Sequence, residues 1–210
     1  FRPTRDLLHV RGLLLTGDTL DVFVCHLPSR SGGAKESEPY RLHAARILYT
    51  EADSILNIRL HPQIIIMGDF NDYPTNKSIQ KILEAEVPPV TTNNLASTTG
   101  STNFSTVAPS SLKLYHLLAR KAKSKDFGSY KYRGEWGLLD HLIVSGTLLN
   151  PANSFSTSEN KATVSKLPFL LTEDKKYGDK EPFRTYKGMK YQGGISDHLP
   201  IYVDFNLILY

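Results

Sequence analysis

Short apolar runs that end in polar residues constrain the fold of this chain more than any other feature. Residues 64–67 (Ile-Ile-Ile-Met) are short and β-branched, which predicts a buried strand, and Gly-Asp-Phe-Asn-Asp follows directly at 68–72. Ser-Asp-His-Leu-Pro at 196–200 stands in front of a second predicted strand at 201–205. The sequence therefore predicts a β-rich protein whose polar groups gather where strands enter and leave the sheet.

Size and composition predict one globular domain over residues 1–210. β-rich sandwiches of this length form a single core. Hydrophobic content of 40% and charged content of 22% argue against a disordered or fibrous chain. No apolar run is long enough to cross a membrane. The net charge of +4 weakly favours an anionic partner. A single cysteine, Cys25, excludes an internal disulfide and leaves the cellular compartment open.

Periodicity predicts alternating strands and helices. The predicted strands are 7–15, 20–25, 63–67, 138–144 and 201–205. One predicted helix begins at Ser37, and two others cover 77–85 and 112–123. The first two strands flank a Gly-Asp turn, which favours an antiparallel hairpin. Ser37 is the predicted N-cap of a helix whose apolar stripe covers one face of the sheet.

Two stretches depart from this pattern. Residues 91–111 are rich in Ser, Thr and Asn, which predicts a mobile surface loop without chemistry. Residues 150–194 are too long for an ordinary connection, and we interpret them as an insertion beside the site.

Four short motifs next to predicted strands give the chain a family resemblance. They are His-Leu-Pro-Ser at 26–29, Gly-Asp-Phe-Asn at 68–71, Leu-Asp-His at 139–141 and Ser-Asp-His-Leu-Pro at 196–200. With these motifs in order, the chain resembles the endonuclease/exonuclease/phosphatase superfamily, which includes deoxyribonuclease I, abasic-site endonucleases, sphingomyelinases and inositol polyphosphate phosphatases. The resemblance implies an α/β fold in which a two-sheet β-sandwich is flanked by helices in four layers.

The resemblance covers the family's central and C-terminal part. Family members begin with strands that carry an Asn near the phosphate and a Glu that binds the metal, and no Glu lies between Phe1 and His26. We therefore expect that residues 1–210 alone bind Mg²⁺ poorly and hydrolyse phosphoesters weakly or not at all. We also expect an unpaired edge of the sheet, because the preceding strands are absent.

The resemblance implies metal-assisted hydrolysis of phosphoester bonds. Asp197 is the expected ligand of Mg²⁺ or Mn²⁺, because hard divalent ions prefer carboxylate oxygen. His198 is expected to take a proton from the attacking water, and Asp140 to hold its ring. Asp69 would orient or deprotonate the water, or protonate the leaving oxygen, while Asn71 donates to a phosphoryl oxygen. Whether Asp69 or His198 is the base stays open.

Five further residues are candidates for substrate contact. His26 lies where the family often has a histidine that contacts the phosphate or assists the leaving group. Arg30 is expected to clamp a phosphate from the same loop as Ser29. Tyr130 and Trp136 belong to a run of alternating aromatic and basic residues, which can stack on bases or pack beneath the sheet, and both interpretations stay open.

A nuclease or other phosphodiesterase is the favoured activity. His141 follows Asp140 where inositol phosphatases commonly carry Arg, whereas Tyr-Lys-Tyr at 130–132 partly resembles those phosphatases. An inositol-phosphate-type phosphomonoesterase is thus one alternative, and a non-catalytic module that binds phosphate or nucleic acid is another. The expected partner is a phosphorylated substrate, with nucleic acid among the candidates, and the oligomeric state stays open.

Overall fold

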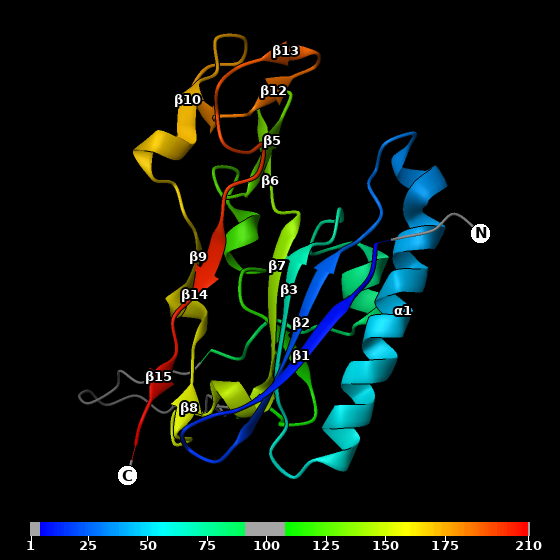
Figure 1. Cartoon of the computed structure of the whole chain (residues 1–210), viewed down its shortest axis with the longest axis vertical. Coiled ribbons are helices and arrows are strands. Elements are labelled where there is room, and N and C mark those ends of the chain that lie inside the picture. The colour runs from blue at the N-terminus through cyan, green and yellow to red at the C-terminus, as the bar shows by residue number, and fades with distance from the viewer. Residues whose placement is uncertain (1–4, 91–107, 210) are drawn as a thin grey trace, which may run out of the picture.

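A five-stranded sheet lies at the centre of the molecule. The structure, a computed structural model, describes residues 5–90 and 108–209. In spatial order the strands are β1 (Leu8–Leu13), β2 (Thr19–His26), β3 (Gln63–Asp69), β7 (Asp140–Ser145) and β4 (Leu114–His116). β2 and β3 are parallel, and the other neighbours are antiparallel. Helix α1 (Ala34–Ile58) covers one face of this sheet (Figure 1).

Short antiparallel ladders form the layer on the other face. β9 (Ala162–Val164) pairs with β14 (Ile201–Val203), and β8 (Phe155–Ser156) pairs with β15 (Asn206–Leu207). Figure 1 shows these strands across the central sheet from α1. The fold is therefore mixed α/β with a central sheet, which confirms the predicted class.

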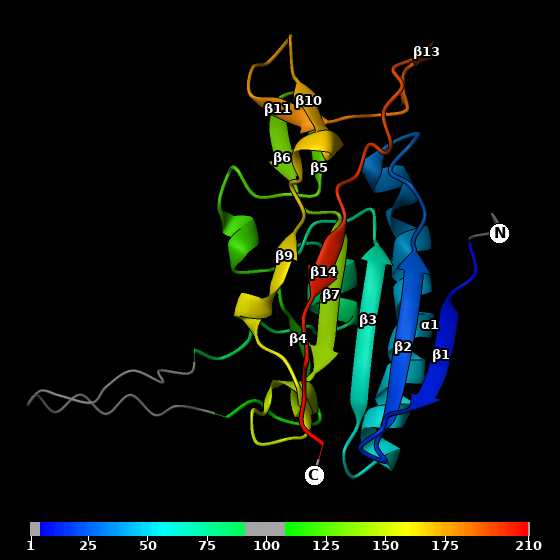
Figure 2. The same ribbon diagram turned by 60° about the vertical axis from the view of Figure 1, so that its left-hand side comes forward.

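Smaller elements complete the description. The remaining strands are β5 (Tyr130–Tyr132), β6 (Glu135–Gly137), β10 (Leu171–Glu173), β11 (Lys180–Pro182), β12 (Tyr186–Lys187) and β13 (Lys190–Tyr191). The short helical turns are η1 (Ser78–Ile82), η2 (Lys121–Lys123), η3 (Gly146–Leu149), η4 (Glu159–Lys161) and η5 (Pro168–Leu170). Figure 2 shows the β5–β6 and β10–β11 hairpins at the end of the sheet where β3 ends. No helix in the described parts of the chain is long and apolar enough to cross a membrane.

Both faces of β3 are buried, which explains its uninterrupted apolar sequence. Ile64 and Ile66 pack toward α1 with Leu48, whereas Ile65 packs into a second cluster with Leu142 on the opposite face. Burying each of these side chains contributes about 2 kcal/mol. The two clusters hold the helix, the sheet and the ladders in three packed layers.

Helix α1 begins earlier than the sequence predicted. Gly33 precedes it with a φ of 120°, and the Ser37 hydroxyl donates to the Gly33 carbonyl at 2.6 Å. Ser37 therefore lies in the first turn, and its prediction as the N-cap is wrong. The predicted apolar stripe is confirmed, because Leu48, Ala52 and Ile55 are all buried.

The predicted helix at 112–123 is wrong. Leu114–His116 forms strand β4 against β7, and only Lys121–Lys123 is helical. All three β4 side chains are buried, and periodicity cannot separate such a short apolar run from a buried helical turn. The predicted helix at 77–85 is the single π-helical turn Ser78–Ile82.

The two stretches that break the sequence pattern have different outcomes. Residues 91–107 of the predicted mobile loop lie outside the described residues. Residues 150–194 contain strands β8 to β13, and β8 and β9 pair with the two C-terminal strands. The interpretation of 150–194 as an insertion stays a prediction.

Strand β1 forms an edge of the sheet. Among the described residues it pairs with β2 alone, and all six of its residues are exposed. Its outer backbone groups have no strand partner in the described parts of the chain.

A buried carboxylate ties this edge to α1. Asp21 on β2 is fully buried and receives His9 Nε2 at 2.7 Å, Arg11 Nε at 2.9 Å and the Arg59 guanidinium. Burial raises the pKa of Asp21, but hydrogen bonds from Arg11 and His9 and the charge of Arg59 outweigh it, so the pKa lies below its ordinary value of 3.8. Because Arg59 directly follows α1, this cluster fixes the helix against the hairpin.

We expect Asp21→Asn to lower the free energy of unfolding by about 2 kcal/mol at neutral pH, because the Arg11 and Arg59 guanidinium groups lose their carboxylate and His9 loses a hydrogen-bond partner. The ionised carboxylate stabilises the fold above its unfolded pKa of about 3.9, and this stabilisation is lost as pH falls through the lower folded pKa. Urea unfolding of the unaltered protein and the variant measures this loss of free energy of unfolding at pH 7 and at pH 3. Glu51→Gln, on the exposed face of α1, is the matched control. A pH-independent loss would contradict the electrostatic explanation.

Candidate active site

Sheet register places three polar side chains in one row. His26 ends β2, Asp69 ends β3 and Asp140 begins β7, and these residues are paired across the two ladders. Residues paired on adjacent strands project to the same face of a sheet. His26 Nε2 lies 3.4 Å from Asp69 Oδ2. The end of β3 therefore brings together side chains that are far apart in the sequence.

Asp140 holds His198 by a short hydrogen bond. His198 Nδ1 lies 2.6 Å from Asp140 Oδ2, and the Ser129 hydroxyl donates to the same oxygen at 2.5 Å. The Leu199 amide donates to the Ser129 carbonyl at 2.7 Å, which holds the 196–200 segment beside β7. The predicted contact between Asp140 and His198 is thus present. Sequence reasoning missed Ser129, because a lone serine before an aromatic run carries no distinguishing signal.

The turn after β3 needs unusual backbone geometry. Gly68 has a φ of 131°, and a Cβ there would lie 2.0 Å from the Cys25 carbonyl oxygen, so only glycine fits. Asn71 has a left-handed φ of 50°, a conformation that Asn tolerates. Its backbone amide donates to Asp69 Oδ1 at 2.8 Å, and its side-chain amide donates to the Leu27 carbonyl at 2.9 Å. Both bonds are internal, so donation to a phosphoryl oxygen stays a prediction.

Burial and charge shift the pKa values of two site residues upward. Burial raises the pKa of Asp69, and the charge of Asp140 raises it further. The hydrogen bond from the Asn71 amide and the charges of His198 and His26 lower it, but by less. Burial alone would lower the pKa of His198, but the Asp140 hydrogen bond and the charges of Asp140, Asp69 and Asp197 outweigh it. The site therefore favours a protonated imidazole more than water does.

A buried ion pair with helix α1 stabilises the turn that follows β3. Asp72 lies 2.8 Å from Arg41 Nε, and both side chains are buried. Arg41 also donates to the Ser37 hydroxyl at 2.7 Å and the Ala34 carbonyl at 2.8 Å. The Ser78 hydroxyl donates to Asp72 at 2.7 Å. Sequence reasoning missed Arg41, because no local pattern indicates that the helix supplies a charged partner to this turn.

His141 also supports this turn, and its side chain projects to the opposite face of β7 from that of Asp140. Its Nε2 lies 2.9 Å from the Asp72 carbonyl oxygen, which can only accept, so Nε2 carries the proton. Nδ1 then accepts from His116 Nε2 at 2.5 Å, and both rings are neutral. Burial lowers the pKa of His141 to about 4, and it also lowers the pKa of His116 well below the ordinary value of 6.5. Because His141 is fully buried, it does not face a substrate.

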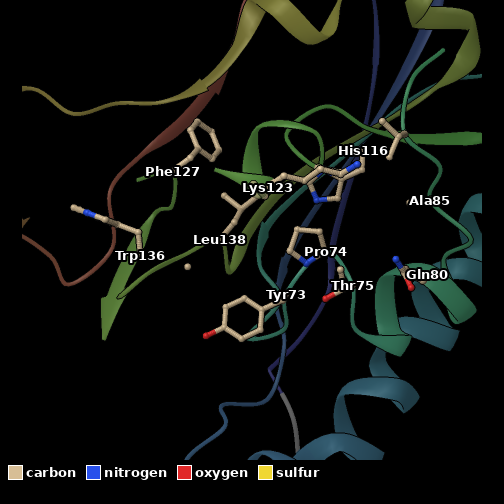
Figure 3. A pocket seen from close by; sticks show the side chains of 14 residues that line it. Tyr73, Pro74, Thr75, Gln80, Ala85, His116, Lys123, Phe127, Trp136 and Leu138 are labelled. Atoms are coloured by element: carbon tan, nitrogen blue, oxygen red, sulfur yellow. The ribbon is translucent and has the colours of Figure 1, made fainter. Parts of the chain in front are cut away.

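The predicted substrate contacts are spread over three places. Tyr130 lies at the site, with its ring 4.9 Å from that of His198. The Arg30 guanidinium lies 4.8 Å from the Tyr73 ring, whereas Ser29 is exposed. Trp136 instead packs beside the core and lines a separate cavity of about 300 Å³, together with Tyr73 (Figure 3). Asp69, Asp140 and His198 do not line that cavity.

Three residues form a group that could hold a metal ion. Asp69, Asp140 and His198 each offer one ligand atom, and these atoms lie within 4.8 Å of one another. Asp197, the metal ligand expected from the sequence, is exposed beside His198 and is not part of this group. The sequence predicted Asp69 and Asp140 at one site but assigned neither of them to the metal.

Comparison with known proteins identifies the family. The model of the endonuclease/exonuclease/phosphatase family matches residues 2–207. No curated protein matches the chain. Three solved structures are similar, with identities of 16%, 13% and 18% and TM-scores of 0.48, 0.47 and 0.43. They are a mannosyl-6-phosphatase from Bacteroides thetaiotaomicron, D. rerio TDP2 complexed with single strand DNA product, and the human Nocturnin catalytic domain with bound sulfate anion.

These likenesses cover this chain almost fully but the other proteins only in part. They span 90%, 95% and 91% of this chain and 52%, 61% and 48% of the respective solved structures. The chain thus spans roughly half the length of these proteins. Because all three TM-scores are below 0.5, the family model carries the assignment.

Asp140→Asn is expected to lower the pKa of His198 toward or below the ordinary value of 6.5, because burial then acts without the opposing hydrogen bond and charge. NMR titration of the His198 imidazole measures the shift. Asp197→Asn is the matched control and should shift the pKa less, since Asp197 is exposed and exerts the weakest of the three charge effects. An unchanged pKa in Asp140→Asn would show that the 2.6 Å contact does not govern His198.

Proposed function

Because this chain belongs to the endonuclease/exonuclease/phosphatase family, we propose that it hydrolyses phosphodiester bonds with the help of a divalent metal ion. The observation that carries the proposal is the bond from Asp140 to His198 Nδ1 beside Asp69. At this end of the sheet, the His198 imidazole supplies a base, the Asp140 carboxylate supports it, and Asp69 supplies a second acid-base group.

His198 acts as the general base in this proposal. With Nδ1 engaged by Asp140, the ring nitrogen left to exchange a proton with water is Nε2. Removing the proton from water leaves an imidazolium, which the carboxylate of Asp140 stabilises. Ser129 donates to the same carboxylate oxygen and fixes its orientation. The pKa above 6.5 makes His198 a stronger base and requires neutral or alkaline pH for its free form.

Asp69 protonates the leaving oxygen. Its raised pKa favours the protonated acid more than an exposed aspartate would. His26 Nε2 lies 3.4 Å away and is half exposed, so it supports a contact with the phosphoryl group. Asn71 fixes the Asp69 carboxylate, while Arg30 and Ser29 bind the substrate from the loop after β2.

The described donor set fits a divalent cation. Asp140 offers a carboxylate oxygen within 4.8 Å of the Asp69 and His198 ligand atoms, and the exposed Asp197 directly precedes His198. These two carboxylates would hold Mg²⁺ or Mn²⁺ through oxygen, which leaves His198 and Asp69 for proton transfer. When bound, such an ion polarises the phosphoryl oxygen and offsets its developing charge.

A phosphomonoesterase of the inositol-phosphate type and a non-catalytic binding module are the rival functions. His141 does not exclude the phosphomonoesterase, because it is buried against the Asp72 carbonyl and does not take the place of a substrate-binding arginine. Hydrolysis of bis-p-nitrophenyl phosphate, single-stranded DNA and inositol phosphates, each with and without Mg²⁺ or Mn²⁺, separates the three functions. Diester turnover that stops on chelation supports the proposal.

We expect His198→Ala to lower turnover of the diester by at least about 10²-fold, because general base catalysis contributes on that order. The melting temperature should change little, since His198 is only half-buried. His61→Ala, which removes an exposed histidine before β3, is the control and should leave turnover unchanged. Near-normal turnover in a folded His198→Ala variant would remove His198 from the mechanism.

A further inference from the structure

A further cavity is lined by residues of the β5–β6 hairpin and of the segment that holds β10 and β11. Figure 2 shows these two parts of the chain next to each other. Its volume is about 210 Å³. Sites for whole small molecules usually measure about 300–1,000 Å³, so this cavity suits one chemical group of a larger ligand. Five of its lining residues are cationic: Lys131, Arg133, Lys176, Arg184 and Lys187.

Acidic residues of the cavity neutralise only two of these cations. Lys131 is buried and lies 3.3 Å from Asp174, and Lys187 lies 2.8 Å from Glu181. Lys131 also donates to the Gly178 and Lys180 carbonyls, so its charge is held by the protein. The remaining three lining cations stay uncompensated.

Aromatic rings hold these three cations in place. Arg133 lies 5.2 Å from the Tyr132 ring, and Lys176 lies 5.0 Å from the Tyr177 ring. In the described parts of the chain, Arg133, Lys176 and Arg184 have no ion pair with a carboxylate. Three positioned charges around a small cavity form a site for an anion.

Arg184 connects this cavity to the candidate active site. Its guanidinium lies 5.1 Å from the Tyr130 ring, and that ring lies 4.9 Å from the His198 ring. One aromatic side chain therefore separates the cavity from the proposed base. Arg184 donates to the Lys131 carbonyl at 2.5 Å, but its Nε is buried without a hydrogen-bond partner among the described residues. The protein satisfies this guanidinium only in part.

We infer that this cavity binds a second phosphate of the substrate, one that is not hydrolysed. The inference rests on the proposed function and narrows it to phosphoesters that carry at least two phosphates. A nucleic acid strand and an inositol polyphosphate both supply such a group. The segment between β10 and β13 thereby selects the substrate, while the end of the central sheet performs the chemistry.

Calorimetry of inorganic pyrophosphate, with EDTA and at low salt, tests the cavity without turnover. Lys176→Ala combined with Arg133→Asn should weaken binding about tenfold or more, because the double variant loses two of the three uncompensated cations. Asn tolerates the left-handed φ of 52° at Arg133, so the variant should fold. Lys175→Ala removes an adjacent exposed charge that does not line the cavity. Equal weakening by the variant and the control would overturn the inference.

Kinetics then connect the cavity to substrate choice. In the double variant, KM for oligothymidylate should rise about tenfold, while kcat/KM for bis-p-nitrophenyl phosphate, which has one phosphate, stays unchanged. Inositol hexakisphosphate as a competitor distinguishes the two phosphate sources. Equal losses on both substrates would overturn the inference. If no diester is hydrolysed by the unaltered protein, the proposed function fails, and pyrophosphate calorimetry still decides whether the cavity binds phosphate.

Discussion

The double pairing of β3 is the constraint on which the site depends. Its parallel ladder with β2 and its antiparallel ladder with β7 both end at Asp69, so His26 and Asp140 lie on either side of that residue. A register slip of one residue would send every side chain of β3 to the opposite face. The slip would also place Met67 or Asp69 where only glycine fits, because a Cβ at Gly68 would lie 2.0 Å from the Cys25 carbonyl oxygen. The close approach of β2 and β3 at Gly68 therefore fixes the register of the polar row.

A second constraint fixes the turn that follows β3. Asp72 receives Arg41 from the helix and Ser78 from the next turn, and its carbonyl receives His141 from β7. Breaking a buried ion pair costs about 3–5 kcal/mol, so the turn cannot relax freely. Asn71, which directly precedes Asp72, is therefore also held in place, and its backbone amide orients the Asp69 carboxylate. The carboxylate is thus oriented by the protein before any substrate binds, which is the condition for electrostatic preorganisation.

The sequence predicted elements whose signal is local and missed those that depend on a distant partner. Buried strands such as β3, and the polar motifs at their ends, are visible because a β-branched run and its turn are contiguous. Strand β4 was mistaken for a helix because its burial comes from β7 and the layers around it. Ser129 and Arg41 were missed for the same reason, since each acquires its role from a carboxylate elsewhere in the chain. The family resemblance predicted Asp197 as the metal ligand. The group of possible ligands in the structure instead contains Asp69 and Asp140, which the fold brings close together.

Charge is distributed unevenly around Tyr130, and this bears on how an anionic substrate approaches. On one side, Asp69 and Asp140 repel each other and would repel a phosphate. On the other side, Arg184 and two further cations line a cavity whose two carboxylates, Asp174 and Glu181, are already paired with Lys131 and Lys187. A substrate with a single phosphate meets the repulsion without compensation unless a cation is bound. In the substrate binding that we propose, a second phosphate in the basic cavity would offset that repulsion through contacts remote from the reacting bond. Such remote binding energy serves to position the reacting group.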